Sequence, residues 1–264
     1  MTLEAAPIKS LNVGQIKVEI YPDRHQAGRA AAQNAADTLR RLASDRGAVA
    51  VIFATGASQF DTLDCLTKIA DVPWPQVVGF HMDEYVHISP DHPASFRRYL
   101  RERLTSKVAM RQFLEIDGSA AKPAEVARTY AHALRAAEPQ LCLLGIGENG
   151  HLAFNDPGVA DFSDPLDAKV VTLDAECRQQ QTAEGWFASA EDVPAEAITL
   201  TIPALLRVPR LIASVPGPRK AKIVRRALED PISTRCPATI LRTHPDVTLY
   251  LDQESARELN GWLS

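Results

Sequence analysis

The sequence predicts an α/β fold, with a mostly parallel central sheet and helices on both of its faces. Residues 48–54 form a continuous apolar run, as a strand that is buried on both faces requires, and residues 141–144 and 210–215 also predict buried strands. Turn residues bound these runs, and segments with helical spacing separate most of the predicted strands. This alternation of strands and helices favours a parallel sheet in three layers.

The N-terminal part of the chain predicts two strand–helix units. Residues 1–14 show no pattern, and we expect them to be irregular. Residues 18–21 alternate like a strand, and Asp23 can cap the alanine-rich helix that follows and ends near Gly47. The strand at 48–54 leads through a turn of small residues into a second helical pattern.

The middle of the chain continues in the same way. Residues 77–80 and 113–116 predict short strands, and residues 94–104 and 123–137 have apolar positions at helical spacing. We expect four arginines of the first of these helices to form a solvated face: Arg97, Arg98, Arg101 and Arg103.

The C-terminal half predicts further strands and helices. The strands are expected at residues 141–144, 170–173, 196–200, 210–215, 239–241 and 247–251. Helical segments are expected at residues 202–206 and 220–228, whereas residues 174–181 read as helical or irregular. No repeat, linker or boundary interrupts the pattern, so we expect one domain over residues 1–264.

Composition excludes several classes of function. Of the 264 residues, 45% are apolar and 23% are charged, and the net charge of -4 comes without a basic block, which argues against nucleic acid or membrane surfaces as partners. The four cysteines lack metal-ligand spacing and are expected to be reduced. Without a signal peptide or an apolar run of transmembrane length, a cytoplasmic location is expected.

Residues 141–158 contain the strongest candidate for a catalytic centre. A buried strand is followed by three glycines and then by the polar residues His151, Asn155 and Asp156. Titratable groups just past the carboxyl end of a strand lie where open α/β sheets bind ligands. Gly145, Gly147 and Gly150 also match a dinucleotide fingerprint, but the turn at 155–158 leaves no room for the long helix that this motif requires.

Three further groups follow predicted strands. The small residues Thr55, Gly56, Ala57 and Ser58 can form an anion cradle at a helix N-terminus, although a plain N-cap by Thr55 or Ser58 explains them equally well. Asp83 follows the strand at 77–80 and is a candidate site residue. The alternative is that Asp83 is the N-cap of a helix that begins at Glu84.

His81 is interpreted as a core or rim histidine, and Lys220 lies on the first turn after the strand at 210–215. In a parallel sheet these groups and His151 can meet at one edge. A phosphate anchor beside a carboxylate and a histidine suits proton abstraction next to a carbonyl, or the opening of a sugar ring. Neither a metal site nor a nucleophile elbow is indicated.

Ordered blocks along the chain resemble those of one known family. The blocks are A-T-G-A-S at Ala54, F-H-M-D-E-Y-V at Phe80, H-P-A-S-F at His92, G-I-G-E-N-G-H-L-A-F-N-D-P-G at Gly145, V-P-G-P-R-K-A at Val215 and L-R-T-H-P-D-V-T at Leu241. They resemble the glucosamine-6-phosphate deaminase (isomerase) and 6-phosphogluconolactonase superfamily. The M-D-E-Y and G-H-L-A-F-N blocks are typical of the deaminase branch, since the lactonase branch would have an acid at Asn149.

The resemblance implies a Rossmann-like three-layer sandwich and an isomerase that also releases ammonia by hydrolysis, without a metal or other cofactor. The product would be fructose 6-phosphate. Asp83 would move a proton between C2 and C1, and His151 would open the sugar ring, held by Asn149 and Asp156. The phosphate would be bound by Thr55, Gly56, Ala57, Ser58 and Lys220. Weaker candidates for contact with the substrate are Glu84, Gly150 and Arg178.

Two departures from the family keep other functions open. Asp156 stands where the family usually has glutamate, and no arginine stands near residues 185–187, where the family has one that contacts phosphate; Arg178 could replace it. A non-catalytic protein that binds sugar phosphates is therefore one alternative, and a lactonase is another. The small-molecule partner is expected to be a phosphosugar, and the chain to be a monomer or homo-oligomer.

Overall fold

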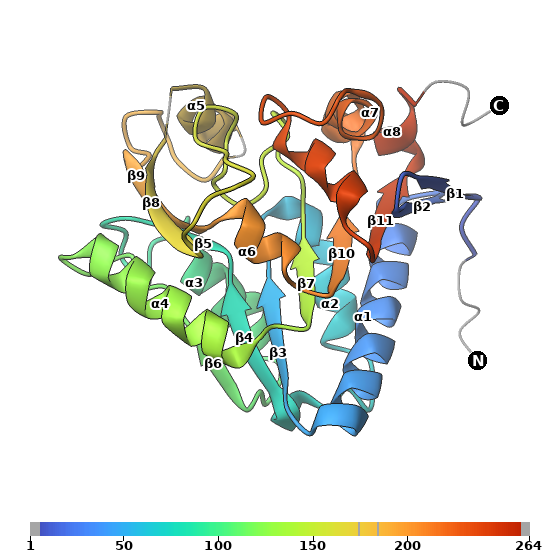
Figure 1. Ribbon diagram of the computed structural model, residues 1–264, viewed down its shortest axis with the longest axis horizontal. Coiled ribbons are helices and arrows are strands. Elements are labelled where there is room, and N and C mark those ends of the chain that lie inside the picture. The colour runs from blue at the N-terminus through green and yellow to red at the C-terminus, as the bar shows by residue number, and fades with distance from the viewer. Residues whose placement is uncertain (1–5, 174, 184, 260–264) are drawn as a thin grey trace.

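Eight strands form the main sheet of the computed structural model, which describes residues 6–173, 175–183 and 185–259 (Figure 1). Their order across the sheet is β1-β2-β11-β10-β7-β3-β4-β6. In chain order the strands are β1 Lys9–Val13, β2 Ile16–Tyr21, β3 Val49–Phe53, β4 Val77–His81, β6 Gln112–Leu114, β7 Leu141–Leu144, β10 Arg210–Ser214 and β11 Val247–Asp252. Only β1 pairs antiparallel with its neighbour, so the predicted mostly parallel sheet is confirmed.

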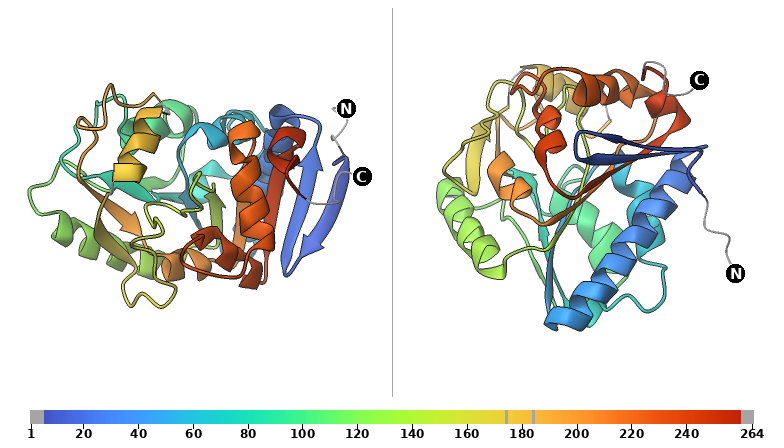
Figure 2. Two further views of the ribbon diagram at one scale, coloured as in Figure 1. Left: turned by 90° about the horizontal axis from the view of Figure 1, so that it is seen from above. Right: turned by 45° about the vertical axis from the view of Figure 1, so that its right-hand side comes forward.

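Helices cover the sheet on both faces. In chain order, the α-helices of the described residues are α1 Arg24–Arg46, α2 Phe60–Leu66, α3 Phe96–Leu100, α4 Pro123–Ala137, α5 Ala175–Ala183, α6 Ile202–Leu206, α7 Ala221–Glu229 and α8 Gln253–Ala256. Helices α1 and α4 lie on opposite sides of the strands in the right-hand view of Figure 2. Among the described residues, no helix is long and apolar enough to span a bilayer.

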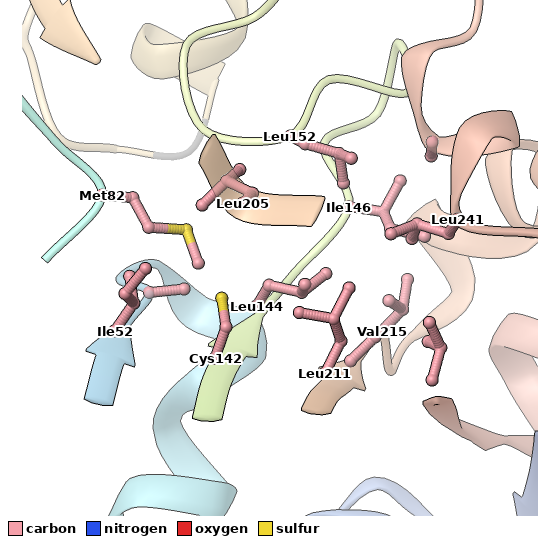
Figure 3. Packing of buried hydrophobic residues seen from close by; sticks show 14 of the residues in the cluster. Ile52, Met82, Cys142, Leu144, Ile146, Leu152, Leu205, Leu211, Val215 and Leu241 are labelled. Carbon is pink, nitrogen blue, oxygen red and sulfur yellow. The ribbon is translucent and has the colours of Figure 1, made fainter. Parts of the chain in front are cut away.

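The alternation of side chains along β3 explains the three layers. Val51 and Phe53 pack into a cluster with the alanine-rich face of α1, whereas Ile52 packs into the cluster on the other face, together with residues of α4 and α7. Figure 3 shows this second cluster, in which Ile52, Cys142 and Leu211 come from neighbouring strands. Every side chain of β3 is therefore buried, as its continuous apolar sequence predicted.

A second, smaller sheet is antiparallel and was not predicted. It consists of β5 Asp83–Tyr85, β9 Glu196–Leu200 and β8 Ala168–Thr172, in the order β5-β9-β8. The sequence located β8 and β9 as strands but gave no sign that they leave the main sheet, because local patterns do not specify a partner. This small sheet determines the direction in which the chain leaves β4 at Asp83.

Two other predictions are wrong. Residues 9–13, expected to be irregular, form β1, which pairs with β2 across a turn at Gly14. Residues 239–241, expected to be a strand, belong to a 3-10 helix, Pro237–Thr243, instead. The amide of Ala238 in this helix donates to the carbonyl of Gly150 (2.8 Å), so tertiary contact with the loop after β7 outweighs the local preference for a strand.

Candidate functional site

Four loops at the carboxyl edge of the main sheet line one pocket of about 280 Å³, the scale of a small-molecule site. The loops follow β3, β4, β7 and β10, which lie next to one another in the sheet in the order β10-β7-β3-β4. The predicted site residues that line the pocket are Thr55, Gly56, Ala57, Ser58, Asp83, His151 and Lys220. Groups that lie far apart in the sequence therefore share one cavity.

His151 is held by a short network behind the pocket wall. Its Nδ1 lies 3.0 Å from Oδ1 of Asp156, and the Asn149 side-chain amide donates to the same oxygen at 2.7 Å. The backbone amide of His151 donates to Asn149 Oδ1 (3.0 Å). Since Asp156 accepts at Nδ1, the proton of the neutral ring lies there, and Nε2 carries the lone pair that can exchange a proton with a ligand.

Asp156 reaches His151 although it is one methylene shorter than glutamate. Burial raises the pKa of Asp156, but hydrogen bonds from His151 and Asn149 outweigh this effect and hold the pKa below its usual value. The carboxylate is therefore ionised and can stabilise a protonated imidazole. Asn155, the other polar residue singled out in this loop, is fully buried and donates to the carbonyl of Leu200 (2.8 Å), which anchors the loop to β9.

Two glycines of the loop have different functions. A side chain at Gly147 would come within 2.2 Å of the His151 ring, so only glycine lets the imidazole lie against the backbone there. Gly150 has a φ of 95°, a conformation that favours glycine. Gly150 does not line the pocket, so its predicted contact with the substrate is not supported by the geometry.

Asp83 enters the pocket at the start of β5. Its side chain is only 8% exposed, and no hydrogen bond to its carboxylate occurs among the described residues. Burial, with the carboxylates of Glu84 and Asp156 nearby, raises the pKa of Asp83 well above its usual value. Because Asp83 begins a strand, the alternative that it caps a helix is wrong. A carboxylate in such an environment is suited to accept a proton from carbon.

Glu84 points away from the pocket and organises the next loop. Its carboxylate accepts hydrogen bonds from the hydroxyl of Ser95 (2.8 Å), the amide of Phe96 (3.1 Å) and both the amide and Nε of Arg97 (3.0 and 3.3 Å). Arg97 is only 5% exposed, so its predicted place on a solvated face is wrong. Burying Arg97 supplies the partner that a buried glutamate requires.

The cradle, residues 55–58, is fastened from two sides. Tyr99 donates its hydroxyl proton to the carbonyl of Gly56 (2.8 Å), and the buried side-chain amide of Gln59 donates to the carbonyl of Leu144 (3.1 Å). Neither the 3-10 helix Ala57–Gln59 nor α2 has a side-chain cap, so the alternative of a plain N-cap is wrong. The cradle hydroxyls remain at the pocket wall.

Two other predictions have different outcomes. His81 lies in the core, where its Nε2 accepts from the amide of Ile116 (2.7 Å) and burial lowers its pKa to about 3, so the interpretation as a core histidine is confirmed. Arg178 does not line the pocket, and its buried Nε has no hydrogen-bond partner in the described chain. Residues 145–173 contain no helix, which agrees with the rejection of a dinucleotide motif after β7.

The pocket residues that the sequence analysis missed include Arg24, Glu148, Gln181, Trp186 and Arg219. Gln181 Oε1 accepts from the hydroxyl of the buried Tyr85 (2.7 Å), which turns the amide NH₂ of Gln181 away from Tyr85. Arg24 follows β2 and lies at the same sheet edge, and that position was the one signal that could have identified it. The sequence around Gln181 has no pattern that marks a site. The family resemblance placed a phosphate contact near Trp186, but no arginine stands there.

Comparison with known proteins gives a consistent picture. Residues 22–250 match the family model described as glucosamine-6-phosphate isomerases/6-phosphogluconolactonase. The glucosamine-6-phosphate deaminase of Exiguobacterium sibiricum is 38% identical over 207 residues, which cover 78% of this chain and 80% of the relative. The enzyme of the same name from Rhodopirellula baltica is 32% identical over 257 residues, covering 94% and 98%.

Solved structures share the fold. A monomeric glucosamine-6-phosphate deaminase superposes with a TM-score of 0.84 at 29% identity and covers 91% of this chain and 99% of its own. The 6-phosphogluconolactonase of Trypanosoma brucei has a TM-score of 0.75 at 18% identity and covers 92% and 98%. The predicted Rossmann-like class of this chain is confirmed by these neighbours.

Proposed function

The chain belongs to the glucosamine-6-phosphate isomerase/6-phosphogluconolactonase family, and from this premise we propose that it is a glucosamine-6-phosphate deaminase. The reaction takes up one water and converts glucosamine 6-phosphate to fructose 6-phosphate and ammonia. One observation carries the proposal: a buried carboxylate, Asp83, and a histidine oriented by a carboxylate, His151, line the same pocket as a small-residue cradle.

The cradle and Lys220 bind the phosphate group in this proposal. Small residues at 55–58 let backbone amides approach an anion, and the fixed carbonyl of Gly56 keeps the turn in place. Lys220 brings a positive charge from the start of α7, and its Nζ lies 2.8 Å from the carbonyl of Ile146 in the loop after β7. The phosphate end thus orients the sugar toward Asp83 and His151.

His151 opens the sugar ring. Its Nε2 takes the proton of the C1 hydroxyl and returns a proton to the ring oxygen, which yields the open-chain aldehyde. The ionised Asp156 stabilises the imidazole while it carries the extra proton, and Asn149 holds Asp156 in position. Both partners lie behind the ring and not in the pocket, so the substrate meets only the imidazole.

Asp83 moves the proton between carbons. Its carboxylate removes the C2 proton of the open-chain amino sugar and returns a proton to C1. The aldehyde oxygen gains the proton that the amine loses, so C1 becomes an alcohol carbon and the C2 amine becomes an imine. Water then adds to C2 and ammonia leaves, which gives the ketose. The raised pKa of Asp83 makes it a stronger base than a solvated aspartate and suits this step.

The deaminase activity is favoured over the lactonase activity by the relatives. Curated relatives at 31–38% identity are named glucosamine-6-phosphate deaminases, whereas the lactonase of Trypanosoma brucei is only 18% identical and shows the fold alone. A cytoplasmic location is part of the proposal, since the thiols of Cys65, Cys142, Cys177 and Cys236, which form no disulfide among the described residues, suit a reducing compartment.

The test is the release of ammonia and fructose 6-phosphate from glucosamine 6-phosphate by the wild type and by Asp83→Asn. Loss of a general base lowers turnover by roughly 10²–10⁴-fold, and we expect the variant to keep its affinity for fructose 6-phosphate. Asp117→Asn is the matched control, because Asp117 is an exposed acid outside the pocket. Its turnover should equal that of the wild type.

Each alternative predicts a different result. A wild-type protein that binds fructose 6-phosphate without releasing ammonia would be a non-catalytic sugar-phosphate-binding protein. Hydrolysis of 6-phosphogluconolactone without deamination would identify a lactonase. Full deaminase activity in Asp83→Asn would remove Asp83 from the mechanism.

A further inference from the structure

Basic side chains gather at the cradle end of the pocket. Arg24, Arg219 and Lys220 all line it beside residues 55–58. Nε of Arg219 pairs with the Glu148 carboxylate at 2.7 Å, and Glu148 also lines the pocket. The Arg219 pair therefore presents charges of both signs to a ligand.

Arg24 differs because its acidic partner lies outside the pocket. Its Nε donates to Asp61 Oδ2 at 2.6 Å, and its Nη2 donates to the carbonyl of Ala57 in the cradle at 3.0 Å. Asp61 is not among the residues that line the cavity. No described residue accepts a hydrogen bond from Nη1 of Arg24, so the guanidinium is fixed at the cradle with donors to spare.

We infer that Arg24 is a binding residue for the phosphate group of the substrate. The inference rests on the proposed function, which makes the bound anion a sugar phosphate. A guanidinium presents its N–H donors in a planar fork that fits two phosphate oxygens. Because Nη2 already touches the carbonyl of Ala57, a phosphate bound by the cradle amides lies next to this fork. Asp61 orients the fork without contributing negative charge to the pocket wall.

Isothermal titration with inorganic phosphate and with fructose 6-phosphate tests the inference on wild type, Arg24→Gln and Arg24→Lys. Hydrogen bonds to a charged group contribute about 1.5–3 kcal/mol, so Arg24→Gln should weaken both ligands by roughly 10- to 100-fold. Arg24→Lys keeps the charge and should recover part of the affinity. In turnover, KM of Arg24→Gln should rise while kcat changes little.

Arg40→Gln is the matched control. Arg40 lies on the same helix, pairs with Asp37 (2.6 Å) and donates to the carbonyl of Ala70 (2.7 Å), but it is far from the cavity lining. Its phosphate affinity should equal that of the wild type. Affinity within twofold of the wild type in Arg24→Gln would overturn the inference.

A second result would also overturn the inference, because it would show that Arg24 holds the cradle in place and does not bind phosphate. If Arg24→Lys were as weak as Arg24→Gln and both unfolded at a lower temperature without ligand, Arg24 would only fasten Ala57. Failure of the proposed function has a different signature, namely phosphate binding by the wild type without ammonia release. A wild type that releases ammonia but binds neither inorganic phosphate nor fructose 6-phosphate in titration would overturn the inference alone.

Discussion

Asp156 reaches His151 although the family resemblance implies the longer glutamate at this position. The chain between His151 and Asp156 folds back on itself, with a bridge between Leu152 and Asn155 and a φ of 51° at Ala153. This turn returns the short carboxylate to within 3.0 Å of Nδ1 of His151. The sequence identified both residues but could not show that the distance closes, because it depends on the turn between them.

Substitution of Asp156 tests this arrangement. Asp156→Asn removes the negative charge that stabilises a protonated His151, and we expect kcat to fall by roughly 10²–10⁴-fold. Asp156→Glu keeps the charge but adds a methylene to a buried position, which costs about 1–3 kcal/mol when packing is tight, and kcat should fall less. Steady-state kinetics measure both effects, with Asp161→Asn, an exposed change in the same loop, as control.

Asp156→Glu with a higher kcat than the wild type would contradict this account of the loop. Such a result would mean that the aspartate is a poorly placed substitute and that the buried space accepts the longer side chain. Equal kcat in Asp156→Asn would mean that His151 needs no charged partner.

At the scale of elements, local patterns predicted the strands that end at the site but not the contacts that fasten them. Strand β3 and the cradle were predicted from an apolar run followed by small residues. The hydroxyl of Tyr99 on α3 and the amide of Gln59 hold the cradle through carbonyls that any sequence would have. Backbone acceptors leave no trace in the sequence, and so these contacts could not be predicted.

Tyr99→Phe tests the fastening of the cradle. The change removes the hydrogen bond to the carbonyl of Gly56 but keeps the stacking on Phe60, so the free energy of unfolding should fall by about 1 kcal/mol. A looser cradle should raise KM for the phosphosugar several-fold with kcat nearly unchanged.

Tyr21→Phe is the control for this effect. The hydroxyl of Tyr21 donates to Glu19 (2.8 Å) and its ring stacks on Tyr250, away from the residues that line the pocket. Its stability should fall by a similar amount while KM stays constant. A rise in KM in both variants would mean that KM follows general stability and not the cradle.

For the whole molecule, the parallel sheet explains why sequence alone located much of the site. The carboxyl ends of adjacent parallel strands lie at one edge of a sheet. The residues that follow β3, β4, β7 and β10 therefore meet there. The order of these strands and the separate sheet of β5, β9 and β8 were not predicted, since pairing is a long-range property. Arg24 and Gln181 line the pocket from α1 and α5. The sequences of these segments indicate ordinary helices and do not mark a site.

The buried acid at this edge also has a predicted effect on the stability of the whole protein. The pKa of Asp83 is raised in the folded state, so between its unfolded value near 3.8 and its folded value the native protein binds more protons than the unfolded chain. Stability due to this group is therefore present at low pH and is lost as pH rises through the folded pKa. Asp83→Asn, which cannot ionise, should unfold at a higher temperature than the wild type at neutral pH.

Thermal unfolding between pH 4 and pH 8 measures this effect, and each 1 kcal/mol of stabilisation corresponds to roughly 2–4 °C in a protein of about this size. The gain of Asp83→Asn over the wild type should be largest at the high end of the range and smallest near pH 4. Asp117→Asn should show the opposite sign, because hydrogen bonds from Ser119 lower the pKa of Asp117 in the folded state. If Asp83→Asn lost both activity and stability at pH 8, the loss of turnover would reflect damage to the fold; a more stable but inactive variant would show that the protein keeps an unfavourable buried charge for catalysis.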